Sequence, residues 1–279
     1  MPPLPRASIV PAMTSNAADA ESRWALILGA SSGFGAAVAR KLATDGYDVC
    51  GVHLDRRSTI ASAEELERAI RAAGRRALFF NINAADDAKR AEVLDGLARV
   101  AAPGSVRLLF HSLAFGSLAP LVAVDDKSSA RKSQVEMTLD VMASSLVYWA
   151  QALVWRGLIA EGGRILAMTS AGSHRVTAGY GMVSAAKAAL EAYIRQLAFE
   201  LAPRGIAVNA LRAGVTDTPA LRKIPGWEEI KARAERVNPG GRATNTKDVA
   251  DLVSLLVKPE SRWVTGNVIG VDGGEDVVG

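Results

Sequence analysis

The stretch Trp24–Gly35, WALILGASSGFG, carries the clearest structural signal of the chain. Its first seven residues form a short apolar run, which is typical of a buried β-strand, and an alanine-rich segment with helical periodicity follows. Glycines stand at 29, 33 and 35, in the pattern Gly-x-x-x-Gly-x-Gly. Because glycine lacks a Cβ atom, it permits a tight turn and lets a pyrophosphate approach the backbone at the helix N-terminus. The strand, the glycine loop and the helix therefore predict a dinucleotide-binding unit.

The alternation of apolar strand and helix continues along the chain. After the first strand at 24–30, further strands are expected at 47–54, 76–82, 106–112, 162–170, 205–212 and 267–274. Helical patterns lie at 34–46, 63–74, 86–101, 128–160 and 184–202. Strands that are apolar along their whole length are typical of a parallel sheet covered by helices. The sequence predicts an α/β fold: a single doubly wound Rossmann domain at 23–279, with a seven-stranded parallel sheet and helices on both faces.

Composition narrows the class of protein. The 279 residues include 33 basic and 29 acidic side chains, a formal net charge of +4. These charges are interspersed, which indicates a solvated surface and no nucleic-acid partner. Cys50 is the single cysteine and can form no internal disulfide, which favours a reducing, cytoplasmic location. No apolar run approaches the roughly 20 residues of a membrane span, and residues 1–22 lack a signal peptide's apolar centre. We therefore expect a disordered leader and no membrane partner.

A second stretch, SAGSHRVTAGYGMVSAAK at 170–187, carries the candidate catalytic groups. Ser170 ends a predicted strand, and Tyr180 and Lys187 stand at the entry to an alanine-rich helix. Seven residues on a helix turn through about 700°, so Tyr180 and Lys187 share one face, about 10 Å apart along the axis. A phenol near an ammonium suits acid catalysis. Ser170 is either a third catalytic group or only a strand-end hydroxyl.

These motifs, with Val-Asp-Gly-Gly at 271–274, resemble the short-chain dehydrogenase/reductase (SDR) superfamily over about residues 24–275. The usual SDR spacing is Tyr-x-x-x-Lys, and here Val183 stands at the tyrosine position. The longer Tyr-x6-Lys spacing and the His-Ser-x-Ala-Phe sequence at 111–115 resemble bacterial enoyl-[acyl-carrier-protein] reductases. The sequence GVTDTPALRKIPG at 214–226 is similar to the NADPH-preferring, type III branch of those enzymes.

The resemblance implies an oxidoreductase of fatty acid biosynthesis that reduces the C2=C3 double bond of trans-2-enoyl thioesters with NADPH. Hydride reaches Cβ while charge grows on the more distant thioester oxygen, so an acid placed further out suits this reaction. Tyr180 would bind that oxygen, and Lys187 would bind the ribose hydroxyls. Two alternatives stay open: an SDR that reduces a carbonyl or another activated alkene, and a dinucleotide-binding regulator without turnover.

The resemblance also assigns cofactor residues by position. They are Gly29, Ser31, Ser32, Gly33, Phe34, Gly35, Asn81, Ile82, Ser112, Leu113, Ala114, Lys187, Gly214, Val215, Thr216 and Thr218. Arg56 and Arg57 follow the second strand and would hold the 2′-phosphate of NADPH through charge-assisted bonds. NADH is the less favoured alternative, in which Asp55 binds the ribose and the two arginines are solvated. No metal is expected.

Residues 216–242 contain two short helical pieces bounded by Pro and Gly, which we expect to close over the substrate as a lid. The expected substrate contacts are Tyr180, Phe115, Leu221, Ile224 and Trp227. For the three lid residues among them, packing against the sheet edge is an equal alternative.

The partners expected from the resemblance are an acyl thioester on acyl carrier protein and further copies of the chain, in a homotetramer or homodimer. Tyr148, Trp149 and Trp155 lie either at the oligomer interface or in the core. His111 is expected to be a strand-end residue paired with backbone. Met142 stands where many SDRs have a relay asparagine, so that part of the common relay is absent or differently built.

Overall fold

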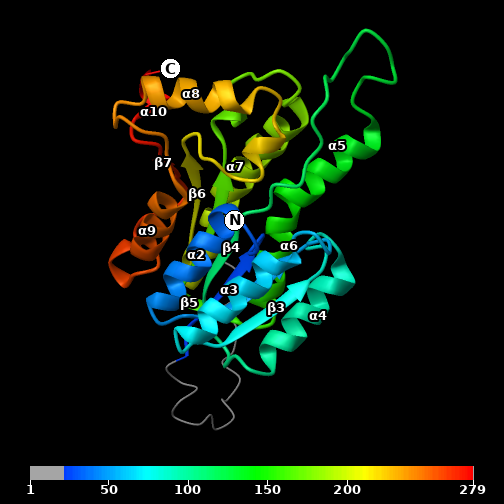
Figure 1. Ribbon diagram of the computed structural model, residues 1–279. Helices are drawn as coiled ribbons and strands as arrows, with labels where there is room; N and C mark the ends of the chain where they lie inside the picture. Colours follow the sequence, from blue (N-terminus) through cyan, green and yellow to red (C-terminus); the bar gives the residue numbers. More distant parts are fainter. Residues whose placement is uncertain (1–21, 279) are drawn as a thin grey trace.

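The computed structural model describes residues 22–278, so the expected leader lies outside the described residues except for its last position. Seven parallel strands form one sheet in the order β3-β2-β1-β4-β5-β6-β7. Their bounds are β1 (Trp24–Leu28), β2 (Asp48–His53), β3 (Ala77–Asn81), β4 (Val106–His111), β5 (Ile159–Thr169), β6 (Ala207–Ala213) and β7 (Val268–Val271). Figure 1 shows helices on both sides of this sheet. The predicted single doubly wound Rossmann domain is confirmed.

Two apolar cores lie on the two faces of the sheet. One face is covered by α2 (Gly33–Thr44), α3 (Ile60–Ala72) and α9 (Thr246–Leu256). The other is covered by α4 (Asp87–Ala98), α6 (Ser145–Trp155) and α7 (Gly181–Leu201). Because side chains alternate along a strand, Leu26 enters one core and its neighbour Ile27 enters the other. This is why β1 is apolar along its whole length.

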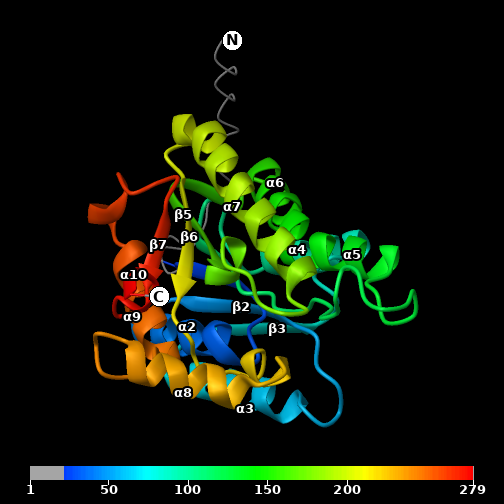
Figure 2. The same ribbon diagram turned by 90° about the horizontal axis from the view of Figure 1, so that it is seen from above.

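The carboxyl ends of the strands face the segments that are not part of the two helical layers. These segments include α5 (Lys132–Leu139), α8 (Trp227–Val237) and α10 (Glu275–Val278). An extended arm at 116–131 projects beside α5 in Figure 1. Seen from above, α7 and α8 lie on opposite sides of the sheet (Figure 2). The space between them lies over the strand ends.

The predicted helix at 128–160 is shorter and less regular than expected. Helical structure begins at Lys132 and ends at Trp155, and its middle, η1 (Asp140–Ser144), is π-helical. Gly157 follows with a φ of 64°, a left-handed conformation that glycine adopts without strain and that ends helices. β5 begins two residues later. Glycine at this position therefore separates helix from strand.

The same stretch, Lys132–Trp155, is long and apolar enough to cross a membrane, with a mean hydropathy of 1.2 over its most apolar window. It contains no uninterrupted apolar run of that length, because polar residues are spaced along it. Half of that window is buried inside the fold. Packing against the sheet therefore accounts for its apolar side chains.

The strand order reverses between β1 and β4, which begin the two halves of the sheet. In open parallel α/β sheets, ligands bind beyond the carboxyl ends of the strands at this point. Gly29 follows β1 and Ser112 follows β4, and a Cβ atom on Gly29 would lie 2.5 Å from the carbonyl oxygen of Ser112. The glycine thus lets the two strand ends meet, and the cavity described next opens above them.

Candidate active site

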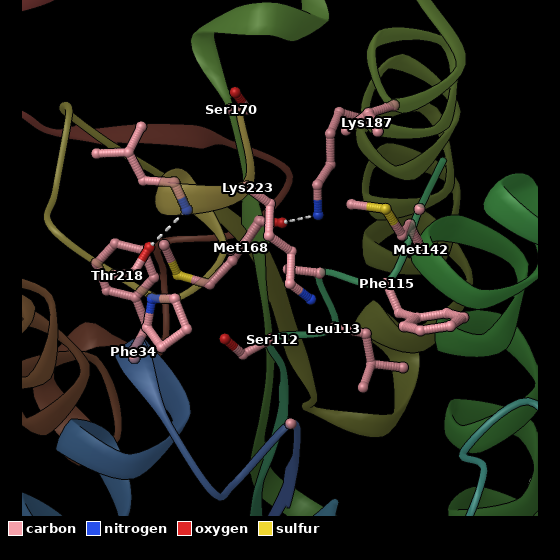
Figure 3. Close-up of a pocket in the computed structure, with 18 of the residues that line it drawn as sticks. Phe34, Ser112, Leu113, Phe115, Met142, Met168, Ser170, Lys187, Thr218 and Lys223 are labelled. Carbon is pink, nitrogen blue, oxygen red and sulfur yellow. Dashed lines mark hydrogen bonds between the residues drawn. The ribbon is translucent and has the colours of Figure 1, made fainter. Parts of the chain in front are cut away.

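A cavity of about 470 Å³ opens at the carboxyl ends of the strands. It is lined by the segments that follow β1, β4, β5 and β6, by α7, and by the expected lid. Figure 3 shows side chains from these separate segments around one space. The expected site residues that do not line it are Gly35, Arg56, Arg57, Asn81 and Trp227. The fold therefore brings most of the residues expected from the sequence together.

The glycine loop forms one wall of the cavity. Ser31, Ser32, Gly33 and Phe34 line it at the N-terminus of α2, where backbone N–H groups lack helical partners. Gly35 has a different function, because a Cβ atom there would lie 2.0 Å from the carbonyl oxygen of Gly29. It holds α2 against the end of β1. The loop therefore has the shape and the donors that an anionic pyrophosphate requires.

Lys187 is buried at the base of the cavity. Its Nζ donates a hydrogen bond to the carbonyl oxygen of Met168 at 2.7 Å (Figure 3). Burial lowers the pKa of Lys187 to about 8, and the nearby carboxylate of Glu191 only partly offsets this. At neutral pH the side chain still carries most of its positive charge. It therefore provides positive potential at the inner end of the site.

Tyr180 and Ser170 meet beside the N-terminus of α7. The Tyr180 hydroxyl donates to Ser170 Oγ at 3.4 Å, and Ser170 Oγ also accepts from the backbone N–H of Gly172 at 3.1 Å. Burial raises the pKa of Tyr180, and the hydrogen bond to Ser170 opposes this only in part. Tyr180 is therefore a neutral phenol at neutral pH, able to donate a hydrogen bond.

Val183 fills the position of the usual SDR tyrosine with an apolar contact. A Cβ atom built on Gly116 would lie 2.7 Å from Met142 Sδ and 3.0 Å from Val183 Cγ2. Val183 and Met142 therefore close against the backbone of Gly116, and both are buried. This part of the cavity offers neither a hydroxyl nor an amide, so Tyr180 is the acid available beside it.

His111 lies behind the cavity and is not part of its lining. Its Nε2 lies 2.9 Å from Ser145 Oγ, which donates to the carbonyl oxygen of Val141 at 2.8 Å. Burial and the charge of Lys187 lower the pKa of His111 to about 3, so the ring is neutral. His111 was expected to pair with the backbone. The hydrogen-bond partner of its Nε2 is a serine side chain, which directly follows the π-helical segment.

The segment after β2 is organised around Asp55. Its carboxylate oxygen lies 2.8 Å from His53 Nδ1, and the amide of Asn81 bonds the Asp55 backbone N–H and C=O at 2.8 and 3.0 Å. Burial opposes ionisation, but hydrogen bonds from Thr59, Ser31 and His53 hold the pKa of Asp55 below its usual value. Because the Asn81 amide is used in this way, Asn81 does not reach the cavity, whereas Ile82 does. The exposed side chains of the adjacent arginines, 56 and 57, are outside the lining.

Two carboxylates from the C-terminal segment were not expected from the sequence. Glu275 lines the cavity and accepts from the backbone N–H of Val215, at 3.1 and 3.2 Å to its two oxygens. Burial raises the pKa of Glu275, and the bond from Val215 partly offsets this. A Cβ atom on Gly214 would lie 2.7 Å from Glu275 Oε2, so glycine there leaves room for the carboxylate.

Asp276 joins the loop at 170–180, which carries the candidate catalytic groups Ser170 and Tyr180, to the end of β6. Its Oδ1 lies 2.9 Å from Arg175 Nη2, and its Oδ2 lies 2.7 Å from Arg212 Nη2. Arg175 also donates to the backbone oxygen of Asp276 at 2.7 Å, and His174 Nε2 lies 3.4 Å from Oδ1. The carboxylate is mostly buried. The C-terminal segment thus holds the loop that carries Ser170 and Tyr180.

The expected lid covers the cavity with apolar side chains and one lysine. Leu221, Ile224 and Ile230 line it, together with Lys223. Trp227 instead lies against the guanidinium of Arg222, at 5.6 Å from the ring centroid. Phe115 lines the cavity from the other side and is half exposed. Within residues 22–278, no three His, Cys, Asp or Glu side chains are grouped as metal ligands.

Comparison with known proteins identifies the family. A family model described as Enoyl-(Acyl carrier protein) reductase matches residues 29–275. The chain belongs to this family of short-chain dehydrogenases/reductases. It resembles bacterial enoyl-[acyl-carrier-protein] reductases, as expected from the catalytic stretch and the sequence after β4.

Individual relatives of this SDR chain carry different names. The NADH-dependent enoyl-[acyl-carrier-protein] reductase of Nostoc sp. is 32% identical over 63% of this chain and 67% of its own. The cis-4-hydroxycyclohexanecarboxylate dehydrogenase of Sinomonas cyclohexanicum is 29% identical over 92% and 97%. A short chain dehydrogenase from Burkholderia cenocepacia, solved in complex with NADP, is 30% identical, covers 91% and 98%, and has a TM-score of 0.78. The comparisons therefore establish an SDR oxidoreductase that binds a pyridine nucleotide.

Proposed function

We propose that the protein reduces the C2=C3 double bond of a trans-2-enoyl thioester in fatty acid biosynthesis. One observation carries the proposal. Val183 fills the position of the usual SDR acid and packs with Met142 against Gly116, and Tyr180 stands further out and lines the cavity. The acid is thus offset from the inner end of the site, where Lys187 lies. This offset suits a substrate whose reacting carbon and developing oxyanion are separated.

The residues have distinct functions in this reaction. A bound nicotinamide dinucleotide supplies the hydride for Cβ. Tyr180 donates a hydrogen bond to the thioester oxygen and stabilises the enolate that forms there. Lys187 holds positive charge beneath the site, and its backbone bond to Met168 fixes its position. Val183 and Met142 exclude water from the inner wall, and Cα takes its proton from solvent when the enolate collapses.

We propose NADPH as the reductant, held at its 2′-phosphate by Arg56 and Arg57. The Burkholderia cenocepacia relative, solved with NADP, supports this choice. The NADH-dependent Nostoc relative favours the alternative. So does Asp55, whose carboxylate lies beside the glycine loop and bonds Ser31. A carboxylate at that place suits ribose hydroxyls and repels a phosphate.

We further propose that the acyl group arrives on acyl carrier protein in the cytoplasm and that the enzyme is a homotetramer or homodimer. The exposed aromatic side chains of α6 and α7 support an interface there. Trp155 and Phe199 are 76% and 74% exposed, whereas Trp149 is buried in the core. Aromatic side chains such as these are enriched at contacts between proteins.

A second function has one observation in its favour. The hydrogen bond between Tyr180 and Ser170 pairs two hydroxyls, and such a pair can polarise a carbonyl that is reduced directly. A substrate panel separates the two. Oxidation of NADPH with crotonyl-CoA and none with acetoacetyl-CoA is expected for the enoyl reductase. The reverse result would reject it in favour of a carbonyl reductase, and dinucleotide binding without turnover would favour a regulator.

A further inference from the structure

Lys223 enters the cavity from the expected lid. It ends the short turn η4 (Leu221–Lys223), and Figure 3 shows its side chain extending into the cavity. Its backbone N–H donates to the carbonyl oxygen of Ala220 at 3.3 Å, but among residues 22–278 its ammonium makes no hydrogen bond or ion pair. Its neighbour Arg222 bonds both carboxylate oxygens of Asp217, at 2.7 and 3.1 Å, and Lys231 lies 3.4 Å from the same carboxylate. Of these three lid cations, only Lys223 is left for a ligand.

The other charged side chains of the cavity are already engaged. Lys187 donates to Met168, and Glu275 accepts from Val215. The glycine loop at 29–35 contains no lysine or arginine. Its backbone N–H groups and the α2 dipole would meet the two charges of a pyrophosphate without a cation. Lys223 is therefore the lining cation whose ammonium, within residues 22–278, makes no bond in the fold.

The lid begins beside that same loop. A Cβ atom built on Gly33 would lie 3.6 Å from Thr218 Cγ2, so Thr218 rests against the first turn of α2. The turn to Lys223 follows directly, because Leu221 N–H donates to Thr218 Oγ1 at 3.2 Å and Arg222 N–H donates to its carbonyl oxygen at 3.1 Å. One short turn thus joins the phosphate end of the cavity to the lysine.

We propose that Lys223 binds the pyrophosphate of the dinucleotide and so makes lid closure depend on the cofactor. This inference rests on the proposed function only in that the cavity takes a dinucleotide. The bond would fix η4 over the cavity and hold Leu221 and Ile224, on either side of the lysine, where they line it. The cofactor therefore binds first, and the acyl site is completed by its binding.

The test compares Lys223→Gln and Lys223→Arg with a matched control, Arg222→Gln, in the full-length protein. Dissociation constants for NADPH, NADH and ADP-ribose are measured by calorimetry without substrate. Lys223→Gln should weaken all three by about tenfold, the size expected for one charge-assisted hydrogen bond. Lys223→Arg should restore most of the affinity, and Arg222→Gln should leave it unchanged. Unchanged melting temperatures without ligand show that each variant folds.

Lid closure has its own measurement. Cofactor should protect the wild-type lid from trypsin, and this protection should be lost in Lys223→Gln. Equal affinities in wild type and Lys223→Gln would overturn the inference. A loss of affinity confined to NADPH would also overturn it, because that result would place the lysine at the 2′-phosphate. An increase only in KM for a carrier-bound thioester would also overturn it, because the phosphate would then be the carrier's. Failure to reduce enoyl thioesters, with the cofactor effect intact, would reject the proposed function alone.

Discussion

The hydroxyl of Tyr180 lies 3.4 Å from Ser170 Oγ, and the side chain four residues before Lys187 is a valine. The proposed acid of the site is thus placed by the loop before α7 and not by the helix itself. Its hydrogen-bond partner also comes from that loop. This arrangement leads to the first prediction.

We expect Tyr180→Phe to lower kcat for an enoyl thioester by about 100-fold or more, the usual cost of removing one oxyanion donor. KM should change little, because the ring remains. Tyr193→Phe, on the outer part of the same helix, is the control and should keep full activity. Ser170→Ala should have a small effect on an enoyl thioester and a large one if a carbonyl is the true substrate. Full kcat in Tyr180→Phe would reject the assigned acid.

Lys187 predicts a dependence of stability on pH. Its pKa is about 8 in the folded protein and 10.5 without burial, so between these pH values the unfolded chain binds more protons. The free energy of unfolding should therefore rise by about 3 kcal/mol as pH increases through this window. Lys187→Met should lose the rise and gain stability at neutral pH, although activity is lost. Denaturant unfolding from pH 7 to 10.5 is the measurement, with exposed Lys247→Met as control. The same pH slope in all three proteins would contradict the burial argument.

Asp276→Asn should loosen the catalytic loop. Asp276 pairs with Arg175 and Arg212 in a mostly buried cluster, so removing its charge should lower the free energy of unfolding by about 2 kcal/mol. KM for the thioester should rise more than kcat falls, because the loop positions Tyr180. Asp251→Asn removes an exposed pair with Lys247 and should cost less than about 1 kcal/mol. A cost no larger than that of the control would show that the cluster does not hold the loop.

Gly35→Ala should disrupt the glycine loop. The added methyl would lie 2.0 Å from the carbonyl oxygen of Gly29, so α2 must move away from β1. We expect cofactor affinity to fall more than tenfold and stability to fall by about 1–3 kcal/mol. Gly270→Ala is the control, because its methyl would meet nothing closer than 3.6 Å. Calorimetric cofactor binding on both variants decides the matter, and normal affinity in Gly35→Ala would contradict the packing role.

The nucleotide preference can be tested at two neighbouring residues. If Arg56 holds the 2′-phosphate, Arg56→Glu should raise KM for NADPH far more than KM for NADH. If Asp55 binds the ribose, Asp55→Ala should raise KM for NADH and spare NADPH. Steady-state kinetics with both nucleotides measure the two variants side by side. Equal effects of Arg56→Glu on both nucleotides would remove the phosphate assignment.

Much of the fold could be predicted because its signals are local. The apolar strands and the glycine loop are each readable within a few residues, and the structure confirms the seven-stranded parallel sheet. The displaced tyrosine was likewise visible as a spacing in the sequence. Glu275 and Asp276 gave no such signal, because they meet the site through contacts with residues about 60 to 100 positions earlier. Likewise, nothing in the sequence indicates that the amide of Asn81 bonds the backbone of Asp55 and that its side chain stays outside the cavity lining.

The π-helical turn at Asp140–Ser144 has a consequence for any alignment of homologous chains. A π-helix closes its hydrogen bonds over one more residue than an α-helix does. Residues before and after the turn are therefore shifted by one position relative to an uninterrupted helix. Counting forward from Lys132 and counting back from Trp155 give different counterparts for the same position in a relative. An alignment with a relative whose helix is α-helical throughout should carry a one-residue gap within 140–144. The residue of that relative that corresponds to Met142 then depends on the side of the gap on which Met142 is placed.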